Sequence, residues 1–248
     1  METSSKIIAI YNSFDGEELL EGSIECIREH VDFILVVAQK VSNYGEKYDG
    51  GYNLANSLNT VDLVIEYNPN LKLNGATNET IKRNIGIEYA KQNGFGYFIL
   101  MDNDEYYQDF GRMKKDFLNS GADGSVCRLW TFYKEPTLRL EEQENYFVPF
   151  IHKLHLKTKT GNNIYPKYVD PTRRINTTNV IVMQDPMFHY SYVRKSIIRK
   201  LSNSSASPNI SKKIKTILDD YNNACEGYFV KDFQQKLISV PNIFNIIL

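Results

Sequence analysis

The chain has 248 residues, of which 42% are hydrophobic and 24% are charged, with a formal net charge of -1 at pH 7. This composition is typical of a globular protein and excludes disordered and fibrous classes. The near-neutral charge gives no general attraction to nucleic acid or to an anionic membrane. Three scattered cysteines, Cys26, Cys127 and Cys225, have no metal-ligand spacing and indicate reduced thiols in a cytoplasmic protein. No apolar run is long enough to span a membrane, and the first five residues lack the pattern of a signal peptide.

The first hundred residues alternate between apolar strands and amphipathic helices, as the spacing of their hydrophobic residues indicates. We expect strands at residues 6–11, 31–38, 61–67 and 97–101, and helices at 17–29 and 78–92. This alternation predicts a parallel sheet. Gly86 lies inside the second helix, where a glycine costs about 1 kcal/mol relative to alanine, and therefore predicts close backbone packing.

Ligand contacts in such a sheet lie in the loops beyond the carboxyl ends of the strands. In this chain those loops contain Tyr11, Asn12, Asp15 and Gln39, which we expect to contact a ligand. Neither loop contains the glycine pattern of dinucleotide-binding proteins or of phosphate-binding P-loops. The two commonest nucleotide-binding motifs are therefore absent.

An acidic motif follows the apolar run 97–101 directly, as Asp102-Asn103-Asp104-Glu105. Two carboxylates spaced one residue apart in an extended chain project from the same side of the backbone, so Asp102 and Asp104 are expected to bind one cation. Oxygen ligands of this type suit Mg2+, Mn2+ or Ca2+. The alternative interpretation is a solvated acidic turn after the strand.

The second half of the chain is less regular. We expect strands at residues 124–132, 146–156 and 180–183, and helices at 108–121, 191–201 and 210–224. A Ser/Asn-rich linker at 202–207 separates a helical extension, residues 204–248, from residues 1–203. The apolar run 243–248 is expected to pack on the domain or to form a dimer contact.

The order of these elements, with Arg83-Asn84-x-Gly86 and the run from Phe98 to Glu105, resembles the GT-A-fold glycosyltransferases, closest to the family 2-like group. The resemblance covers residues 6–200 and is strongest over 80–106. It implies a mixed, mostly parallel central sheet flanked by helices. It also implies that residues 1–106 bind a nucleotide-diphosphate sugar and that residues 107–203 form the acceptor half.

The same resemblance assigns roles to the acidic motif. Asp104 would hold a divalent metal, Mn2+ or Mg2+, on the donor diphosphate, and Asp102 would contact the ribose, the sugar or a metal-bound water. Asn103 and Arg83 would also contact the donor. The chemistry of the reaction agrees with a metal role for Asp104, because a metal on the diphosphate stabilises the negative charge that develops as the bond from the sugar to the diphosphate breaks.

One residue further along the chain also matches the family by position, and two cations follow it. His189 follows the last core strand within His-x-Ser-Tyr, where many GT-A enzymes complete the metal site with a histidine. Arg194 and Lys195 lie one turn beyond it and are expected to reach the diphosphate. The alternative for both cations is a solvated helix face.

Acceptor contacts and the catalytic base are expected from the polar cluster at 165–174. Asp170 is the candidate base, which would take the proton of the acceptor hydroxyl in an inverting transfer, and Glu105 and Asp185 are its rivals. Arg173 would contact the acceptor. Trp130 is either a core residue or a platform on which a sugar stacks.

Two other interpretations remain open. An apolar strand that runs into Asp-x-Asp also occurs in haloacid-dehalogenase-like phosphatases, although Tyr106 stands where threonine or valine is expected there. The third interpretation is a non-catalytic sugar-binding protein on the same fold. The sequence does not decide the donor sugar, the nucleotide base or the acceptor. The candidate acceptors are a glycan, a lipid-linked sugar, a protein and a modified nucleobase.

Overall fold

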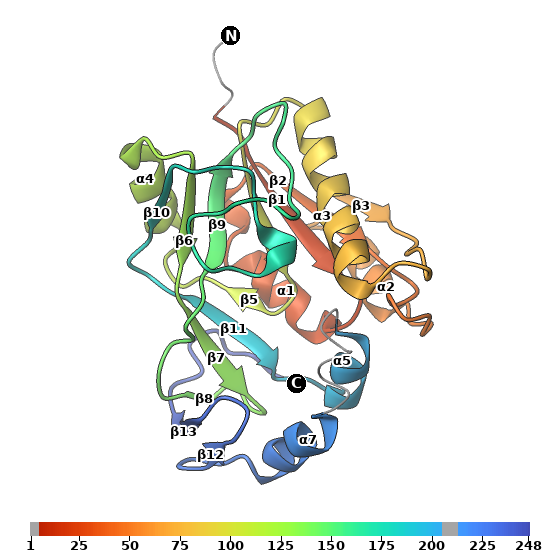
Figure 1. The fold of residues 1–248 in the computed structure, drawn as a ribbon, viewed down its shortest axis with the longest axis vertical. Helices are drawn as coiled ribbons and strands as arrows, with labels where there is room; N and C mark the ends of the chain where they lie inside the picture. Colours follow the sequence, from red (N-terminus) through yellow and green to blue (C-terminus); the bar gives the residue numbers. More distant parts are fainter. Residues whose placement is uncertain (1–4, 205–212) are drawn as a thin grey trace.

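The computed structural model describes residues 5–204 and 213–248, which form two sheets with helices around the larger one (Figure 1). The larger sheet has seven strands in the order β10-β6-β9-β4-β1-β2-β3. Their bounds are β1 Ile7–Ser13, β2 Phe33–Ala38, β3 Leu63–Glu66, β4 Tyr97–Asp102, β6 Gly124–Cys127, β9 Val148–Lys153 and β10 Val180–Val182. All neighbours are parallel except β9, which runs antiparallel to β4 and β6. The predicted mixed, mostly parallel sheet flanked by helices is confirmed.

Helices cover both faces of this sheet, and every residue of β1 is therefore buried. Residues of α1 (Glu17–Glu25) and α4 (Phe110–Ser120) pack against one face. The helix α3 (Gly75–Gln92) packs against the other face and crosses in front of it in Figure 1. A shorter helix, α2 (Gly50–Ser57), contacts β2 and β3.

Close packing of α3 depends on Gly86, as predicted. A Cβ atom at this position would lie 2.2 Å from the Cγ2 atom of Ile10 on β1. The helix therefore approaches the sheet more closely than any other residue would allow. This approach brings the first turns of α3 beside the carboxyl ends of β1 and β4, where Asn12 and Asp102 are paired in register.

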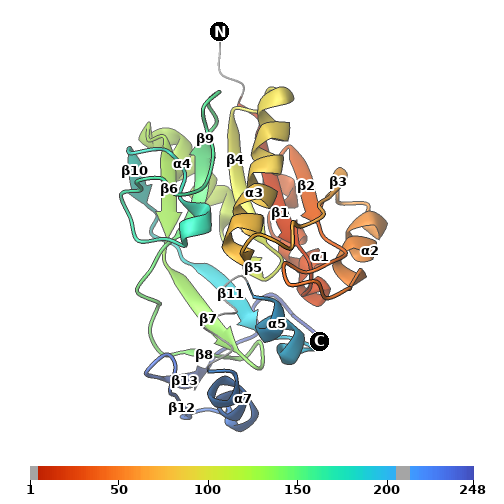
Figure 2. The ribbon, with the colours of Figure 1, turned by 45° about the vertical axis from the view of Figure 1, so that its right-hand side comes forward.

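The smaller sheet has six strands in the order β12-β13-β8-β7-β11-β5 and extends below the larger one (Figures 1 and 2). Its strands are β5 Glu105–Tyr106, β7 Leu129–Tyr133, β8 Leu138–Leu140, β11 Met187–Tyr192, β12 Phe229–Val230 and β13 Gln235–Ser239. The strand β11 pairs with both β5 and β7. It thereby places His189 opposite Glu105, next to the acidic motif.

Two predicted elements of the second half are wrong in their bounds. The strand expected at 124–132 divides at Arg128 into β6 and β7, which belong to different sheets. The helix expected at 191–201 begins only at residue 197, as α5 (Ile197–Asn203), because β11 continues to Tyr192 by pairing with Tyr133. Local hydrophobic spacing does not reveal either change, since both depend on pairing between distant strands.

The C-terminal extension is not helical throughout. The helix α7 (Ile214–Asn223) is followed by β12 and β13, and β13 pairs with β8 through Leu237 and Leu140, which are both buried. The hairpin joins the smaller sheet through this pairing, which packs the two buried leucines across the strands. The predicted boundary at 203/204 stays a prediction.

The apolar C-terminal run packs on the domain. Phe244 contacts the rings of Tyr106, Phe188 and Tyr190, while Ile247 is 87% exposed. A dimer contact through the exposed end stays a prediction. Residues 205–207 of the predicted linker and the first residues of the helix expected at 210–224 lie outside the described part of the chain. Among the residues described, no helix is long and apolar enough to cross a membrane.

Candidate active site

A polar cavity of about 290 Å3 lies at the carboxyl ends of β1, β2 and β4. Ten of the predicted site residues line it: Asn12, Asp15, Gln39, Arg83, Asp102, Asn103, Asp104, Asp170, His189 and Arg194. The sequence-based prediction missed Asn43, Glu79, Lys82 and Lys200, which also line the cavity. The N-terminal strands and the later β11–α5 region therefore contribute to one site.

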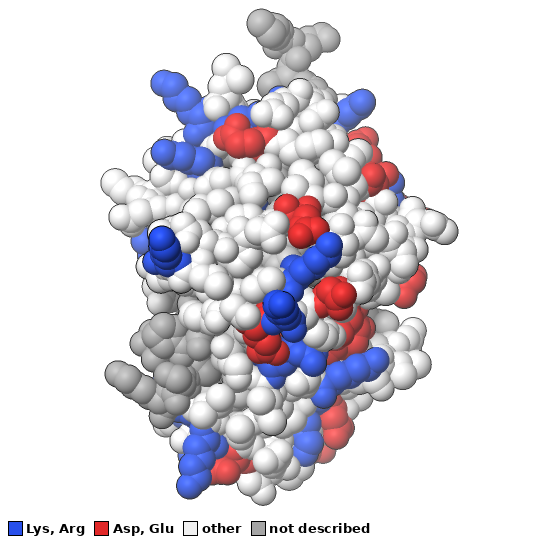
Figure 3. Space-filling model, turned by 90° about the vertical axis from the view of Figure 1, so that its right-hand side faces the viewer, with Lys and Arg blue, Asp and Glu red and all other residues white. Residues whose placement is uncertain are grey.

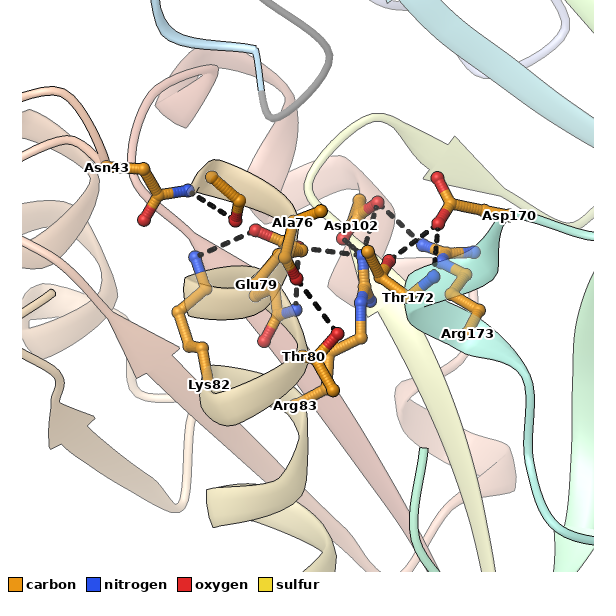
Figure 4. A network of polar contacts seen from close by, with 12 residues as sticks. Asn43, Ala76, Glu79, Thr80, Lys82, Arg83, Asp102, Asp170, Thr172 and Arg173 are labelled. Carbon is orange, nitrogen blue, oxygen red and sulfur yellow. Dashed lines mark hydrogen bonds and ion pairs between the residues drawn. The ribbon is translucent and has the colours of Figure 1, made fainter. Parts of the chain in front are cut away.

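Asp102 ends β4 and is held by two arginines (Figure 4). The Nη2 atom of Arg83 lies 3.0 Å from its Oδ1 atom, and the Nη2 atom of Arg173 lies 2.6 Å from its Oδ2 atom. Burial raises the pKa of Asp102, but Arg173 and Arg83 outweigh burial and lower it to about 2. The carboxylate is therefore ionised and oriented, with about a third of its side chain exposed to the cavity.

Asp104 is buried and paired with different cations. Arg194 donates to its Oδ2 atom, the Nζ atom of Lys200 lies 3.4 Å from the same oxygen, and the Nε2 atom of His189 lies 3.8 Å from Oδ1. Burial raises the pKa of Asp104, and Lys200, Arg194 and His189 together hold it well below its usual range. Asp104 therefore carries a full negative charge at neutral pH.

Asp102 and Asp104 line the same cavity, and their binding of one cation stays a prediction. Residues 103 and 104 form a turn between β4 and β5, so the extended geometry assumed for the two carboxylates is wrong. Asp102 pairs with Arg83 and Arg173, whereas Asp104 pairs with Arg194, Lys200 and His189. Within residues 5–204 and 213–248, no three His, Cys, Asp or Glu side chains are arranged to hold a metal ion.

Asp104 and His189 nevertheless fit a divalent metal that shares its other ligands with a substrate. Burial lowers the pKa of His189 to about 4, although Asp104 opposes this effect, so the imidazole is neutral at pH 7. Its buried Nδ1 atom has no hydrogen-bond partner. One carboxylate and one neutral imidazole are acceptable to Mn2+, which commonly takes substrate phosphates and water as further ligands.

Arg194 is the best placed anion-binding group. Its side chain is 3% exposed, and its Nε and Nη1 atoms are buried without a hydrogen-bond partner. The guanidinium packs directly on Gly16, where a Cβ atom would lie 2.1 Å from Nη1. Buried donors that lack an acceptor favour an anion in the adjacent cavity.

A second polar network joins α3 to the ends of β1 and β2. The Oε1 atom of Glu79 accepts from Asn12 at 3.0 Å and from Arg83 at 2.8 Å, and Lys82 donates to the Oε1 atom of Gln39 at 2.6 Å. Burial lowers the pKa of Lys82, against the opposing effect of Glu79. Glu79 lies four residues before the predicted Arg83 and three before Lys82 on α3, and this spacing was the signal that could have identified Glu79 as their partner.

Glu105 does not reach the cavity. It is 2% exposed, and its Oε1 atom lies 2.6 Å from the Nη1 atom of Arg173. Burial raises the pKa of Glu105 to about 7, although Arg173 opposes this rise. Because the same arginine binds Asp102, Glu105 orients Arg173 and is not placed to act as a base on an acceptor.

Other predicted residues also lie outside the cavity. Trp130 is covered by Arg139, whose guanidinium lies 3.6 Å from the ring centre, so Trp130 offers no platform to a sugar in the cavity. Tyr11 does not line the cavity, and its hydroxyl lies 3.1 Å from the Oγ atom of buried Ser23. Lys195 is exposed, and Asp185 pairs with Arg112 on the surface at 2.7 Å.

Asp170 does line the cavity, at the start of the short helix η2 (Pro171–Arg173). Its Oδ1 atom accepts hydrogen bonds from the backbone nitrogen and the hydroxyl of Thr172, both at 2.7 Å. These bonds fix the side chain and leave Oδ2 available. Asp170 is therefore the candidate base that the geometry favours over its rivals Glu105 and Asp185.

Charges of both signs surround the site without a dominant sign. On the face that carries α2, α3 and α5, basic and acidic side chains are interspersed (Figure 3). This distribution agrees with the formal net charge of -1. The described side chains on this face form no extended basic surface of the kind that binds nucleic acid.

No protein-family model matches the sequence, and no curated protein matches it. Among solved structures, S. aureus TarS 1-349 in complex with UDP-GlcNAc aligns at 12% identity and a TM-score of 0.48, over 88% of this chain and 68% of that one. Glucosyl-3-phosphoglycerate synthase from Mycobacterium tuberculosis, in complex with Mn2+, UDP and glucosyl-3-phosphoglycerate, aligns at 11% identity and a TM-score of 0.45, over 95% and 87%. The chain spans 45% of the longer S. aureus TarS structure. At these scores the likeness alone assigns neither activity nor substrate.

Proposed function

We propose that the protein is a metal-dependent glycosyltransferase that moves a sugar from a nucleotide-diphosphate donor to an acceptor hydroxyl with inversion. One observation carries the proposal: Asp104, neutral His189 and Arg194, whose Nε and Nη1 donors have no acceptor, meet in one cavity at the carboxyl ends of the parallel strands. An anion-binding group beside a carboxylate and an imidazole is what a metal–diphosphate complex requires.

The donor diphosphate would lie against Arg194 and Lys200. Both cations now neutralise Asp104. A divalent metal held by Asp104 and His189, when bound, would supply positive charge that stabilises the leaving diphosphate. Arg194 and Lys200 would then be free to donate to phosphate oxygens instead of to Asp104.

The nucleoside would lie on the opposite side, among the polar groups at the ends of β1 and β2. Asn12, Asp15, Gln39 and Asn43 line that part of the cavity together with Lys82. Gln39 is fixed by donating to Asn43 at 3.1 Å and by accepting from Lys82. Preorganised amides of this kind suit the edge of a nucleobase and the ribose hydroxyls.

Asp170 would act as the general base. In the transfer, the acceptor oxygen forms a bond to the anomeric carbon, the bond from that carbon to the diphosphate oxygen breaks, and the acceptor proton passes to Oδ2 of Asp170. Arg83 and Arg173 keep Asp102 oriented toward the donor. The leaving group departs as the nucleoside diphosphate.

A phosphatase of the haloacid-dehalogenase type is not favoured. Such an enzyme needs a free aspartate nucleophile at the position of Asp102, and here two arginines occupy both oxygens of that carboxylate. A non-catalytic sugar-binding protein would leave Asp170 without a function. A cytoplasmic location stays a prediction.

The proposal is tested by thermal shift with a panel of nucleotide sugars, each with and without Mn2+. We expect stabilisation by one donor only in the presence of metal. Slow release of nucleoside diphosphate from that donor in the absence of an acceptor would then report turnover. Equal stabilisation with and without metal, or no stabilisation by any donor, would contradict the proposal.

A further inference from the structure

A second cavity, of about 660 Å3, is formed by residues 162–168 together with Arg174. Asp170 and Thr172 line the first cavity, whereas Lys167 and Tyr168 shortly before them line the second. The residues that line the second cavity therefore come within two positions of the proposed base, Asp170, along the chain.

Two cations line this second cavity without a carboxylate partner. Within the part of the chain that the structure describes, neither Lys167 nor Arg174 forms an ion pair, whereas Arg173 between them binds both Asp102 and Glu105. Lys167 has only the ring of Phe147, 5.9 Å from its Nζ atom. Two uncompensated cations at one cavity favour an anionic ligand.

Apolar groups of the same cavity are unusually exposed. Tyr168 is 70% exposed and Ile164 is 90% exposed, although both are large side chains next to a polar site. An exposed aromatic ring presents a flat face on which a sugar or polyol can lie. The cavity therefore combines a carbohydrate-type surface with positive charge.

The shape of the cavity is fixed by contacts on its buried side. The hydroxyl of Tyr165 lies 2.7 Å from the Nε2 atom of buried His152, and Asn163 donates to the backbone oxygen of Arg174 at 2.8 Å. These bonds join the loop to β9 and to the segment after η2. The cations are thus carried by an anchored loop and not by a free one.

We propose that this second cavity binds the acceptor, and that the acceptor is a sugar or polyol that carries a phosphate group. Lys167 and Arg174 bind the phosphate, Tyr168 supports the carbon skeleton, and a free hydroxyl extends toward Asp170. The inference rests on the proposed glycosyltransferase function, whose donor site it complements.

The test uses glycerol 3-phosphate as a probe and glycerol as its uncharged match, titrated into the 15N-labelled full chain and followed by NMR. We expect glycerol 3-phosphate to shift the amide signals of residues 162–174, and glycerol to leave them unchanged. In the variant Lys167→Glu/Arg174→Glu, affinity for glycerol 3-phosphate should fall at least about tenfold, since two charge-assisted hydrogen bonds are lost.

Lys157→Glu/Lys159→Glu is the matched control, because both lysines are exposed on the same loop region and neither lines the cavity. This control should keep the affinity of the unaltered chain. Equal loss in both double variants would show a general charge effect and overturn the assignment. Absence of any shift with glycerol 3-phosphate would overturn it as well.

Donor binding separates this inference from the proposed function. The thermal shift with nucleotide sugar and Mn2+ should be the same in the unaltered chain and in Lys167→Glu/Arg174→Glu, since neither residue lines the donor cavity. Donor binding without glycerol 3-phosphate binding would refute the acceptor site alone. Glycerol 3-phosphate binding without donor binding would refute the proposed function. If phosphatidylglycerol vesicles compete with glycerol 3-phosphate for the cavity, the acceptor phosphate is lipid-linked. If they do not compete, the acceptor is a soluble phosphate.

Discussion

Replacing Gly16 with alanine tests how the donor cavity is held together. Gly16 precedes α1 with φ 76°, and the added Cβ atom would lie 2.1 Å from Nη1 and 2.7 Å from Cζ of Arg194. Contacts this short force the guanidinium to shift, and we expect its pairing with Asp104 to be lost. Asp104 would remain beside Lys200 and His189 and keep part of its charge compensation.

The expected cost has two separable parts. Alanine in the left-handed region costs about 1 kcal/mol wherever it is placed. Loss of the buried ion pair between Arg194 and Asp104 adds about 1–3 kcal/mol, below the 3–5 kcal/mol typical of a fully broken buried pair because Lys200 still faces the carboxylate. We therefore expect Gly16→Ala to destabilise the fold by about 2–4 kcal/mol.

Gly94→Ala isolates the first part. Gly94 has φ 70°, close to that of Gly16, and a Cβ atom there would have no atom within 4 Å. Urea unfolding at pH 7 should show a loss of about 1 kcal/mol for this control and a clearly larger loss for Gly16→Ala. Metal-dependent donor binding should weaken only in Gly16→Ala. Equal stability losses in the two variants would refute the packing of Arg194 on Gly16 as the feature that holds Asp104.

Four further predictions follow from the same geometry. Asp104→Asn should abolish metal-dependent stabilisation by the donor while the circular dichroism spectrum keeps its native shape, and donor turnover like that of the unaltered chain would contradict the metal site. His189→Gln should weaken Mn2+ binding about tenfold in a calorimetric titration, and an unchanged titration would remove His189 from the site. Burial lowers the pKa of His189 from its usual value of 6.5 to about 4, so its contribution to stability is complete above pH 6.5 and is lost as the pH falls toward 4. The free energy of unfolding of His189→Gln, measured with urea, should therefore fall less steeply between pH 6.5 and pH 4 than that of the unaltered chain. An identical pH dependence in the two proteins would contradict the buried neutral imidazole. Asp170→Asn should lower kcat at least about a hundredfold with little change in donor KM, and an unaltered kcat would exclude Asp170 as the base.

Much of the first half of the fold could be predicted from the sequence. Strands around Ile8 and Leu100 are continuous apolar runs, which only a sheet covered on both faces can bury. Their carboxyl ends had to meet at one edge because the connecting elements are helices. The polar residues after those strands, including Asn12 and Asp102, were therefore correctly placed in one cavity.

Pairing between distant residues could not be read in the same way. The sequence indicates that Asp102 and Asp104 are acidic, but only folding shows that residues 103 and 104 form a turn and that each carboxylate has its own cations. Lys200 has the same local signature as any surface lysine on a helix. Its role depends on β11 and α5 carrying it back over β4, a contact between residues nearly a hundred positions apart.

The sequence by itself determined the strand-helix order, the parallel sheet and the edge at which charged residues gather, because hydrophobic periodicity is a local property of the chain. The tertiary structure alone decided which charges neutralise one another, which candidate bases face the cavity, and that the C-terminal residues complete a second sheet. Those features depend on the desolvation of ionised groups and on strand pairing across the chain, and neither is encoded in the spacing of neighbouring residues.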